Sequence, residues 1–140
     1  MKATDCRLVL IACADGEEAA RIQETLVREK LAACVSSLPG VRSCYRWRGK
    51  IETAGEVLLL AKTTATAFEA LRSRVAGIHS YEVPEIVALP VMAGHPPYLA
   101  WLADNTSAGR RPGRTARRAP ARRGARPSAG GNARNKKPVP

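Results

Sequence analysis

One histidine and the acidic residues after it are the first candidates for chemistry in this sequence. His79 opens the segment His-Ser-Tyr-Glu-Val-Pro-Glu, which runs to Glu85. A neutral imidazole binds soft or borderline metal ions such as copper, and Cys34 or Glu82 could complete a ligand set. A metal site needs several ligands, however, and only one histidine is well placed. We prefer a hydrogen-bonded His79 that fixes a loop, with Cys34 as a small packing residue.

Lys62 offers a second kind of chemistry, because it ends a strongly apolar stretch. A lysine in that position, with Tyr81 and the carboxylate of Glu85 available, could bind a small anion. A buried structural ion pair explains the same residues equally well. No glycine-rich phosphate loop, Ser/His/Asp order or paired-carboxylate motif is present, so the sequence does not predict an enzyme.

Two aromatic residues indicate a contact surface in the middle of the chain. Tyr45 and Trp47 precede Arg48-Gly49-Lys50, which is typical of a turn. Alternation puts both rings on one face of a strand, and interfaces are rich in Tyr and Trp. We therefore expect Tyr45, Trp47 and Lys50 to lie on a hairpin that presents a contact surface, in preference to a site for a bound ligand.

Hydrophobic periodicity predicts the elements that must position these side chains. Two capping boxes, Asp15 with Glu18 and Thr66 with Glu69, mark the starts of helices. A long strand should bend or bulge at 39–40, and 54–55 is a second candidate bulge. The expected elements are strands at 6–13, 33–47, 51–62 and 85–91 and helices at 15–31, from about 66 to 78, and at 96–105.

The resulting order is β-α-β-β-α-β followed by a short helix. This is the split βαβ, ferredoxin-like arrangement of an α+β protein, in which an antiparallel sheet carries both helices on one face. The other face must meet something, and a homotrimer that packs sheet against sheet would bury it. We expect this domain to span residues 1–106.

Charge is concentrated at the C-terminal end of the chain. Residues 1–106 hold 12 basic and 12 acidic residues, whereas residues 107–140 hold 11 basic residues and no acid. The Arg-, Pro-, Gly- and Ala-rich tail cannot bury a core, so we expect it to be disordered. It would bind polyanions such as nucleic acid non-specifically, or act only as a solubilising extension.

The cysteine pattern and the hydrophobicity favour a cytoplasmic protein. The four cysteines form no Cys-x-x-Cys pair, and the ample apolar core makes reduced thiols the better interpretation than disulfides. The apolar run at 8–12 superficially resembles a lipoprotein signal, but it is short for an export segment. No stretch approaches the roughly 20 apolar residues of a membrane span, so we predict no membrane insertion.

Several short motifs occur in an order that resembles the CutA-type divalent-ion tolerance proteins. The resemblance implies a small cytoplasmic trimer of ferredoxin-like fold, linked to divalent metal ions, whose long hairpins embrace neighbouring subunits. Lys62, Tyr81 and Glu85 then fall in a cleft between subunits. Family members commonly carry proline in place of Ser80, a departure that removes no ligand. The motifs are Leu-Ala-Ala-Cys-Val at 31–35, Tyr-Arg-Trp-Arg-Gly-Lys-Ile at 45–51, Lys-Thr at 62–63, the segment at 79–85, and Tyr98 with Trp101.

The residues and the resemblance together predict a divalent-cation tolerance protein that binds or responds to metal. Copper is the ion to test, and His79 is the best single ligand candidate. The first alternative is a trimeric regulator like the PII proteins, which share this fold and would hold a small anionic ligand near Lys62 and Tyr81. The second alternative is association with nucleic acid through residues 107–140.

Overall fold

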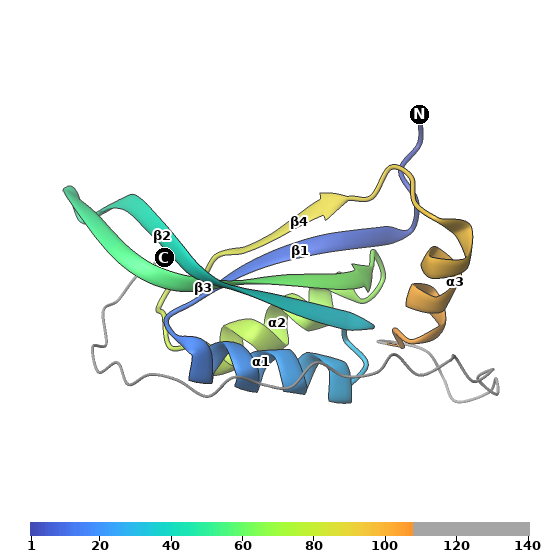
Figure 1. Cartoon of the computed structure of the whole chain (residues 1–140), viewed down its shortest axis with the longest axis horizontal. Helices are drawn as coiled ribbons and strands as arrows, with labels where there is room; N and C mark the ends of the chain where they lie inside the picture. The colour runs from blue at the N-terminus through green and yellow to red at the C-terminus, as the bar shows by residue number, and fades with distance from the viewer. Residues whose placement is uncertain (108–140) are drawn as a thin grey trace.

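Four antiparallel strands form one sheet, and two helices cover one of its faces (Figure 1). In chain order the elements are β1 (Cys6–Cys13), α1 (Gly16–Arg28), β2 (Cys34–Trp47), β3 (Lys50–Thr64), α2 (Phe68–Ile78), β4 (Ile86–Pro90) and α3 (Pro96–Asp104). The strands lie in the order β2-β3-β1-β4, which confirms the predicted split βαβ arrangement. The computed structural model describes residues 1–107, so the predictions for the basic tail lie outside the described residues except at Ser107.

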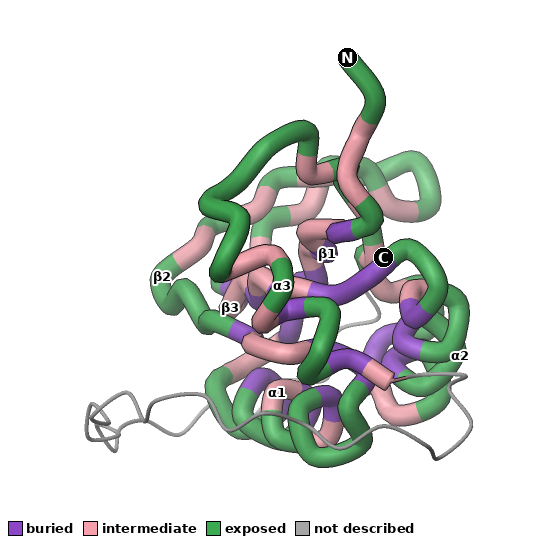
Figure 2. Tube along the Cα trace, turned by 90° about the vertical axis from the view of Figure 1, so that its right-hand side faces the viewer, coloured by how far each residue is buried: buried purple, intermediate pink, exposed green. Residues whose placement is uncertain are grey.

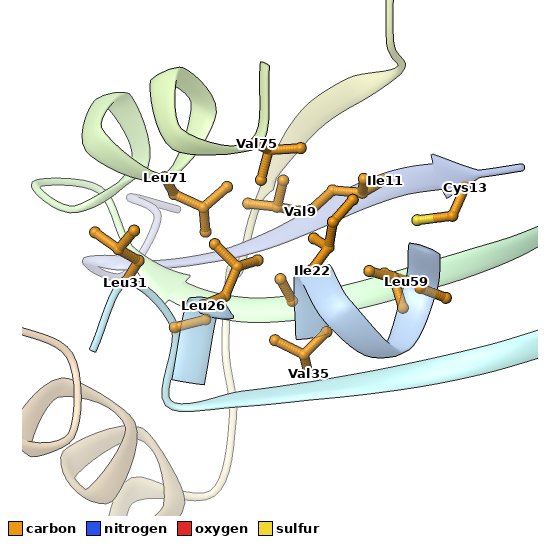
Figure 3. Close-up of a cluster of buried hydrophobic side chains, with 13 residues drawn as sticks. Val9, Ile11, Cys13, Ile22, Leu26, Leu31, Val35, Leu59, Leu71 and Val75 are labelled. Atoms are coloured by element: carbon orange, nitrogen blue, oxygen red, sulfur yellow. The ribbon is translucent and has the colours of Figure 1, made fainter. Parts of the chain in front are cut away.

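The core lies between the sheet and the two helices, because every second strand residue points at them. On β1, Val9 and Ile11 are fully buried, while Leu10 between them faces the other way. Figure 2 shows the buried residues gathered where the helices meet the strands, and Figure 3 shows their side chains interlocking. The helices contribute Ala19, Ile22, Leu26, Leu71 and Val75 to this cluster.

Helix α1 begins largely as its sequence predicts. The Asp15 carboxylate accepts a hydrogen bond of 2.9 Å from the amide of Glu18, as an N-cap residue does. The side chain of Glu18 does not return to the cap residue itself, however. It bonds the amide of Ala14, one residue earlier, at 3.0 Å.

The end of α1 comes earlier than the predicted Leu31. Lys30 has a φ of 57°, and the amide of Leu31 bonds the Leu26 carbonyl at 2.9 Å while that of Lys30 bonds the Val27 carbonyl at 3.1 Å. These two bonds define a Schellman motif, in which a left-handed residue stops the helix. Both Leu26 and Leu31 are buried, which is the apolar contact that accompanies this motif.

The predicted capping box at the start of α2 is wrong. The cap residue is Ala67, which has no side chain able to cap, and α2 starts one residue later. The amide of Ala67 instead bonds the hydroxyl of Thr64 at 3.3 Å. Glu69 pairs with Arg72 at 2.6 Å, so its carboxylate stays on the exposed face of α2 and does not fold back onto Thr66.

The long β2–β3 hairpin contains one of the two predicted bulges. The strand register shifts between Leu38 and Val41, and Gly40 supplies a φ of +79° that a residue with a Cβ adopts only with strain. Ala54 and Gly55 pair in continuous register with the facing strand. The predicted bulge there is wrong, because small residues in a strand also occur without interrupting its ladder.

A two-residue turn closes the hairpin at its tip. Trp47 faces Lys50 across the ladder, and Arg48 and Gly49 between them have φ values of 48° and 79°. Positive φ at both central residues is the signature of a type I′ turn, whose twist matches that of the flanking strands. The hairpin that this turn closes extends well beyond the two covering helices (Figure 1).

The sheet face opposite α1 and α2 remains partly open. Leu38, Val87 and Leu89 point to this side and are 51%, 49% and 42% exposed. Helix α3 lies at the end of the sheet away from the hairpin tip (Figure 1). Within residues 1–107, no helix is long and apolar enough to cross a membrane.

Candidate functional site

The imidazole of His79 is fully buried at the end of α2, and both of its nitrogens are hydrogen-bonded. Nδ1 accepts a bond of 3.0 Å from the amide of Tyr81, and Nε2 lies 2.7 Å from the carbonyl oxygen of Ala12. An amide can only donate and a carbonyl can only accept, so the geometry requires the tautomer with hydrogen on Nε2. Both ring nitrogens of His79 are thus occupied by backbone groups of the protein.

Glu18 faces His79 from the first turn of α1. It is 3% exposed, and its carboxylate accepts bonds from the amides of Ala14 at 3.0 Å and Ser80 at 2.8 Å. Its Oε1 lies 3.6 Å from the Nε2 of His79. Desolvation by itself would raise the pKa of this carboxyl, but the hydrogen bonds from Ser80 and Ala14 outweigh it and lower the pKa overall.

Cys13 completes a buried group of thiol, carboxylate and imidazole. One potential ligand atom from each of Cys13, Glu18 and His79 lies within 4.8 Å of the others. Cys13 itself lies at one edge of the core cluster (Figure 3). Burial, followed by the charge of Glu18, raises the pKa of the Cys13 thiol to about 12. Metal ions bind the thiolate, so this thiol is a poor ligand near neutral pH.

This group does not fit a resident metal ion as it is folded. A histidine that binds metal through Nε2 normally donates a proton from Nδ1 to a carbonyl or carboxylate. In His79 the arrangement is reversed, because Nδ1 accepts from Tyr81 and Nε2 carries the hydrogen. Within residues 1–107, this is the one group of three such side chains close enough to share an ion.

A second polar group lies next to the first, where Tyr81 reaches β3. The Tyr81 hydroxyl donates a bond of 2.9 Å to Glu56, a carboxylate that is only 6% exposed. Desolvation, followed by that bond and the charge of Glu56, raises the pKa of Tyr81 far above its usual range. Desolvation and the charge of Glu56 also raise the pKa of Glu85. Within residues 1–107, neither Glu56 nor Glu85 has a cationic partner.

Lys62 lies away from this group within one chain. Its ammonium donates to the Ser36 hydroxyl at 2.6 Å and lies 3.7 Å from the Cys34 sulfur. Lys62 follows Glu56 by six positions on β3, which corresponds to about 20 Å along a strand. The predicted grouping of Lys62 with Tyr81 and Glu85 can therefore form only between two copies of the chain.

The hairpin residues share one strand face, as alternation predicts. Tyr45 and Trp47 are both half-buried, and the indole Nε1 of Trp47 is buried with no hydrogen-bond partner among residues 1–107. Arg48 lies over the Trp47 ring at 5.5 Å and approaches Glu82 at 3.6 Å. Glu82 is therefore engaged with the hairpin tip and not with His79, while Lys50 is exposed.

Sequence reasoning missed Cys13, Glu18 and Glu56 as members of these groups. Glu56 carried a readable signal, since it is an acidic residue directly before a buried apolar strand segment. The sequence indicates only a capping role for Glu18, whereas its second oxygen accepts from Ser80, which lies 62 positions away. No local pattern marks such a contact.

The sheet order, the two helices on one face and the long hairpin define a small ferredoxin-like α+β protein. The family described as CutA1 divalent ion tolerance protein matches residues 7–105, and the chain belongs to this family.

Relatives with similar sequences and structures agree with this assignment. The divalent-cation tolerance protein CutA of Thermus thermophilus is 50% identical over 99 residues, covering 71% of this chain and 96% of the relative. Its solved structure superposes with a TM-score of 0.72 over 73% of this chain and 99% of that one, at 49% identity. CutA from Xylella fastidiosa gives a TM-score of 0.73 at 43% identity, covering 74% of this chain and 100% of that chain.

The chain is shorter than some of its eukaryotic relatives. The rice chloroplastic protein CutA 1 is 40% identical over 99 residues, which cover 71% of this chain but only 56% of the rice protein. The shared part is therefore the ferredoxin-like domain.

Proposed function

We propose that this protein contributes to divalent-cation tolerance as a cytoplasmic homotrimer, with copper as the first ion to test. The observation that carries the proposal is the family match across residues 7–105. The relatives are named for tolerance and not for a reaction, so the proposed role includes no catalytic step. Copper is preferred because Cys44 and His95 are exposed on the described chain. Thiol and imidazole groups suit copper better than magnesium or calcium.

The open sheet face supports the homotrimer. A surface with Leu38, Val87 and Leu89 exposed is apolar enough to favour burial. Three copies related by a threefold axis would cover it and could bring Lys62 of one copy toward Tyr81 of the next. The four free cysteines support the cytoplasmic location, because cytosolic proteins usually keep their thiols reduced.

The PII-like alternative receives less support from the geometry. A small anionic ligand near Tyr81 would meet the carboxylates of Glu56 and Glu85, which have no cationic partner among the described residues. Like charges at short range oppose binding. The nucleic-acid alternative depends on the basic tail, which lies outside the described residues.

A growth experiment tests the proposed function directly. Source cells that lack this gene should be inhibited at lower Cu²⁺ concentrations than cells that carry it, and expression of the full chain should restore growth. The same cells challenged with equal concentrations of a sodium salt provide the control for ionic strength. Equal inhibition by Cu²⁺, Zn²⁺ and Co²⁺ with and without the gene would contradict the proposal.

A further inference from the structure

We infer that Glu18 and His79 form a metal-free latch that holds the segment after α2 and aims the hydroxyl of Tyr81 at Glu56. In this assignment His79 is a positioning residue, and Cys13 is a packing residue. The inference goes beyond the proposed tolerance function, because it says which buried residues do not hold the ion and what they do instead.

Two successive backbone amides just after α2 are bonded by the side chains of the latch. Ser80 and Tyr81 have no backbone hydrogen-bond acceptor among residues 1–107, and their amides are bonded to Glu18 at 2.8 Å and to His79 at 3.0 Å. Tyr81 is only 7% exposed, and a buried amide without an acceptor costs about 1–3 kcal/mol. The two side chains of the latch therefore replace the helical bonds that end with α2.

The latch connects segments that lie far apart in the sequence. His79 donates to Ala12 at the end of β1, and Glu18 at the start of α1 accepts from Ala14. The latch thus joins the end of β1, the first turn of α1 and the segment between α2 and β4. Each partner belongs to a different element, so its position depends on the others.

The hydrogen bonds of the latch oppose the binding of a metal ion by Cys13, Glu18 and His79. An ion on Nε2 of His79 would displace its hydrogen and leave the Ala12 carbonyl without its donor. An ion on Cys13 would first require loss of a proton from a thiol that burial keeps protonated. The oxygens of Glu18 are already used by Ala14 and Ser80. An ion bound by these side chains would have to displace the hydrogen on Nε2 of His79 and the proton of Cys13, whereas without an ion His79 and Glu18 are both fully hydrogen-bonded.

Tyr81 connects the latch to the open side of the sheet. The rings of His79 and Tyr81 are 4.8 Å apart at their centroids, and the Tyr81 hydroxyl reaches Glu56 at 2.9 Å. The hydrogen bond from the Tyr81 amide to His79 and the contact between the two rings together determine the direction of the Tyr81 side chain. Loss of the latch should therefore release Tyr81 from Glu56.

Amide hydrogen exchange on the full chain tests the latch without any metal. In His79→Ala the Tyr81 amide should exchange at least tenfold faster than in the wild type. In His79→Asn the side-chain oxygen takes the place of Nδ1, as in an Asx-turn, so exchange should stay within about threefold. His95→Ala is the matched control, because His95 is exposed and its side chain forms no capping hydrogen bond to α3. An unchanged rate in His79→Ala, or no rescue in His79→Asn, would overturn the inference.

Metal titration of the full chain gives an independent result, even if His79→Ala does not fold. With Co²⁺ as the probe, Cys13→Ala should leave any thiolate charge-transfer absorption of the wild type unchanged, and it should bind Cu²⁺ within about twofold of the wild-type affinity. A thiolate band that disappears in both Cys13→Ala and His79→Asn would show an ion at this group and overturn the inference. Failure of the growth experiment would leave both of these measurements unaffected.

Discussion

At the scale of residues, Glu18 shows how a buried charge is kept stable in this protein. Its carboxylate is almost fully buried, yet hydrogen bonds lower its pKa below the ordinary value of 4.5 against the opposing effect of desolvation. A carboxyl with a lowered folded-state pKa binds its proton more weakly in the folded than in the unfolded protein. The stability it contributes is therefore present above pH 4.5 and is lost as the pH falls through the folded-state pKa.

Glu18→Gln should lower the free energy of unfolding at pH 7 by about 1.5–3 kcal/mol, because hydrogen bonds to a charged acceptor are lost. The difference from the wild type should shrink as the pH falls below about 4. Urea unfolding at one fixed protein concentration measures both effects. Glu17→Gln is the matched control, since Glu17 is exposed and should change stability by no more than about 0.5 kcal/mol. A difference that is constant from pH 3 to pH 7 would contradict the argument.

At the scale of elements, the β2–β3 hairpin depends on two places where the backbone has positive φ. Gly40 lies within the register shift at +79°, and Arg48 and Gly49 form the turn at the tip. The bulge changes which residues of β2 face each side, so Val41 and the residues alternating after it share a face with Glu56. Without it, the aromatic residues near the tip would point to the opposite side.

Gly40→Ala should destabilise the protein by about 1–2 kcal/mol, because an L-residue is strained in the left-handed region. The added Cβ would meet no atom within 4 Å, so strain and not collision is the cause. Thermal unfolding measures the loss. Gly55→Ala in the facing strand is a matched control, since its Cβ would also enter open space without a positive φ. Equal melting temperatures for the two variants would show that alanine at position 40 is not strained.

At the scale of the whole molecule, a sheet with helices on one side leaves a second side to be covered. Val87 and Leu89 on the edge strand β4 face this side, opposite Leu10 and Leu8 of β1. The proposed homotrimer would bury this surface, and a positive charge within it would oppose assembly.

Val87→Lys combined with Leu89→Lys should convert the assembly to single chains. Light scattering of the full chain should then report about one third of the wild-type mass. Val27→Lys is the control, because Val27 is a comparably exposed residue, 44%, on α1 and away from the open face. An unchanged mass for the double variant would count against assembly through this face, and a wild-type mass equal to one chain would contradict the trimer itself.

The order of elements could be predicted from the sequence because local patterns encode it. A continuous run of β-branched and aliphatic residues marks β1, Asp15 marks the start of α1, and Pro39-Gly40 marks the bulge. The errors occurred where a local signal had a competitor. Thr66 with Glu69 matches a capping box, but the guanidinium of Arg72 binds the Glu69 carboxylate, and the hydroxyl of Thr64 accepts from the amide of Ala67 at the start of α2.

The sequence by itself therefore determined the fold, the family and the faces on which residues lie. Only the tertiary structure decided which side chains meet. It brought Glu18 to Ser80 and His79 to Ala12, and it separated Lys62 from Tyr81. The physical reason is that periodicity reports the direction of each side chain within its own element. Contacts between distant elements depend instead on strand register and helix packing, which no short stretch of sequence contains.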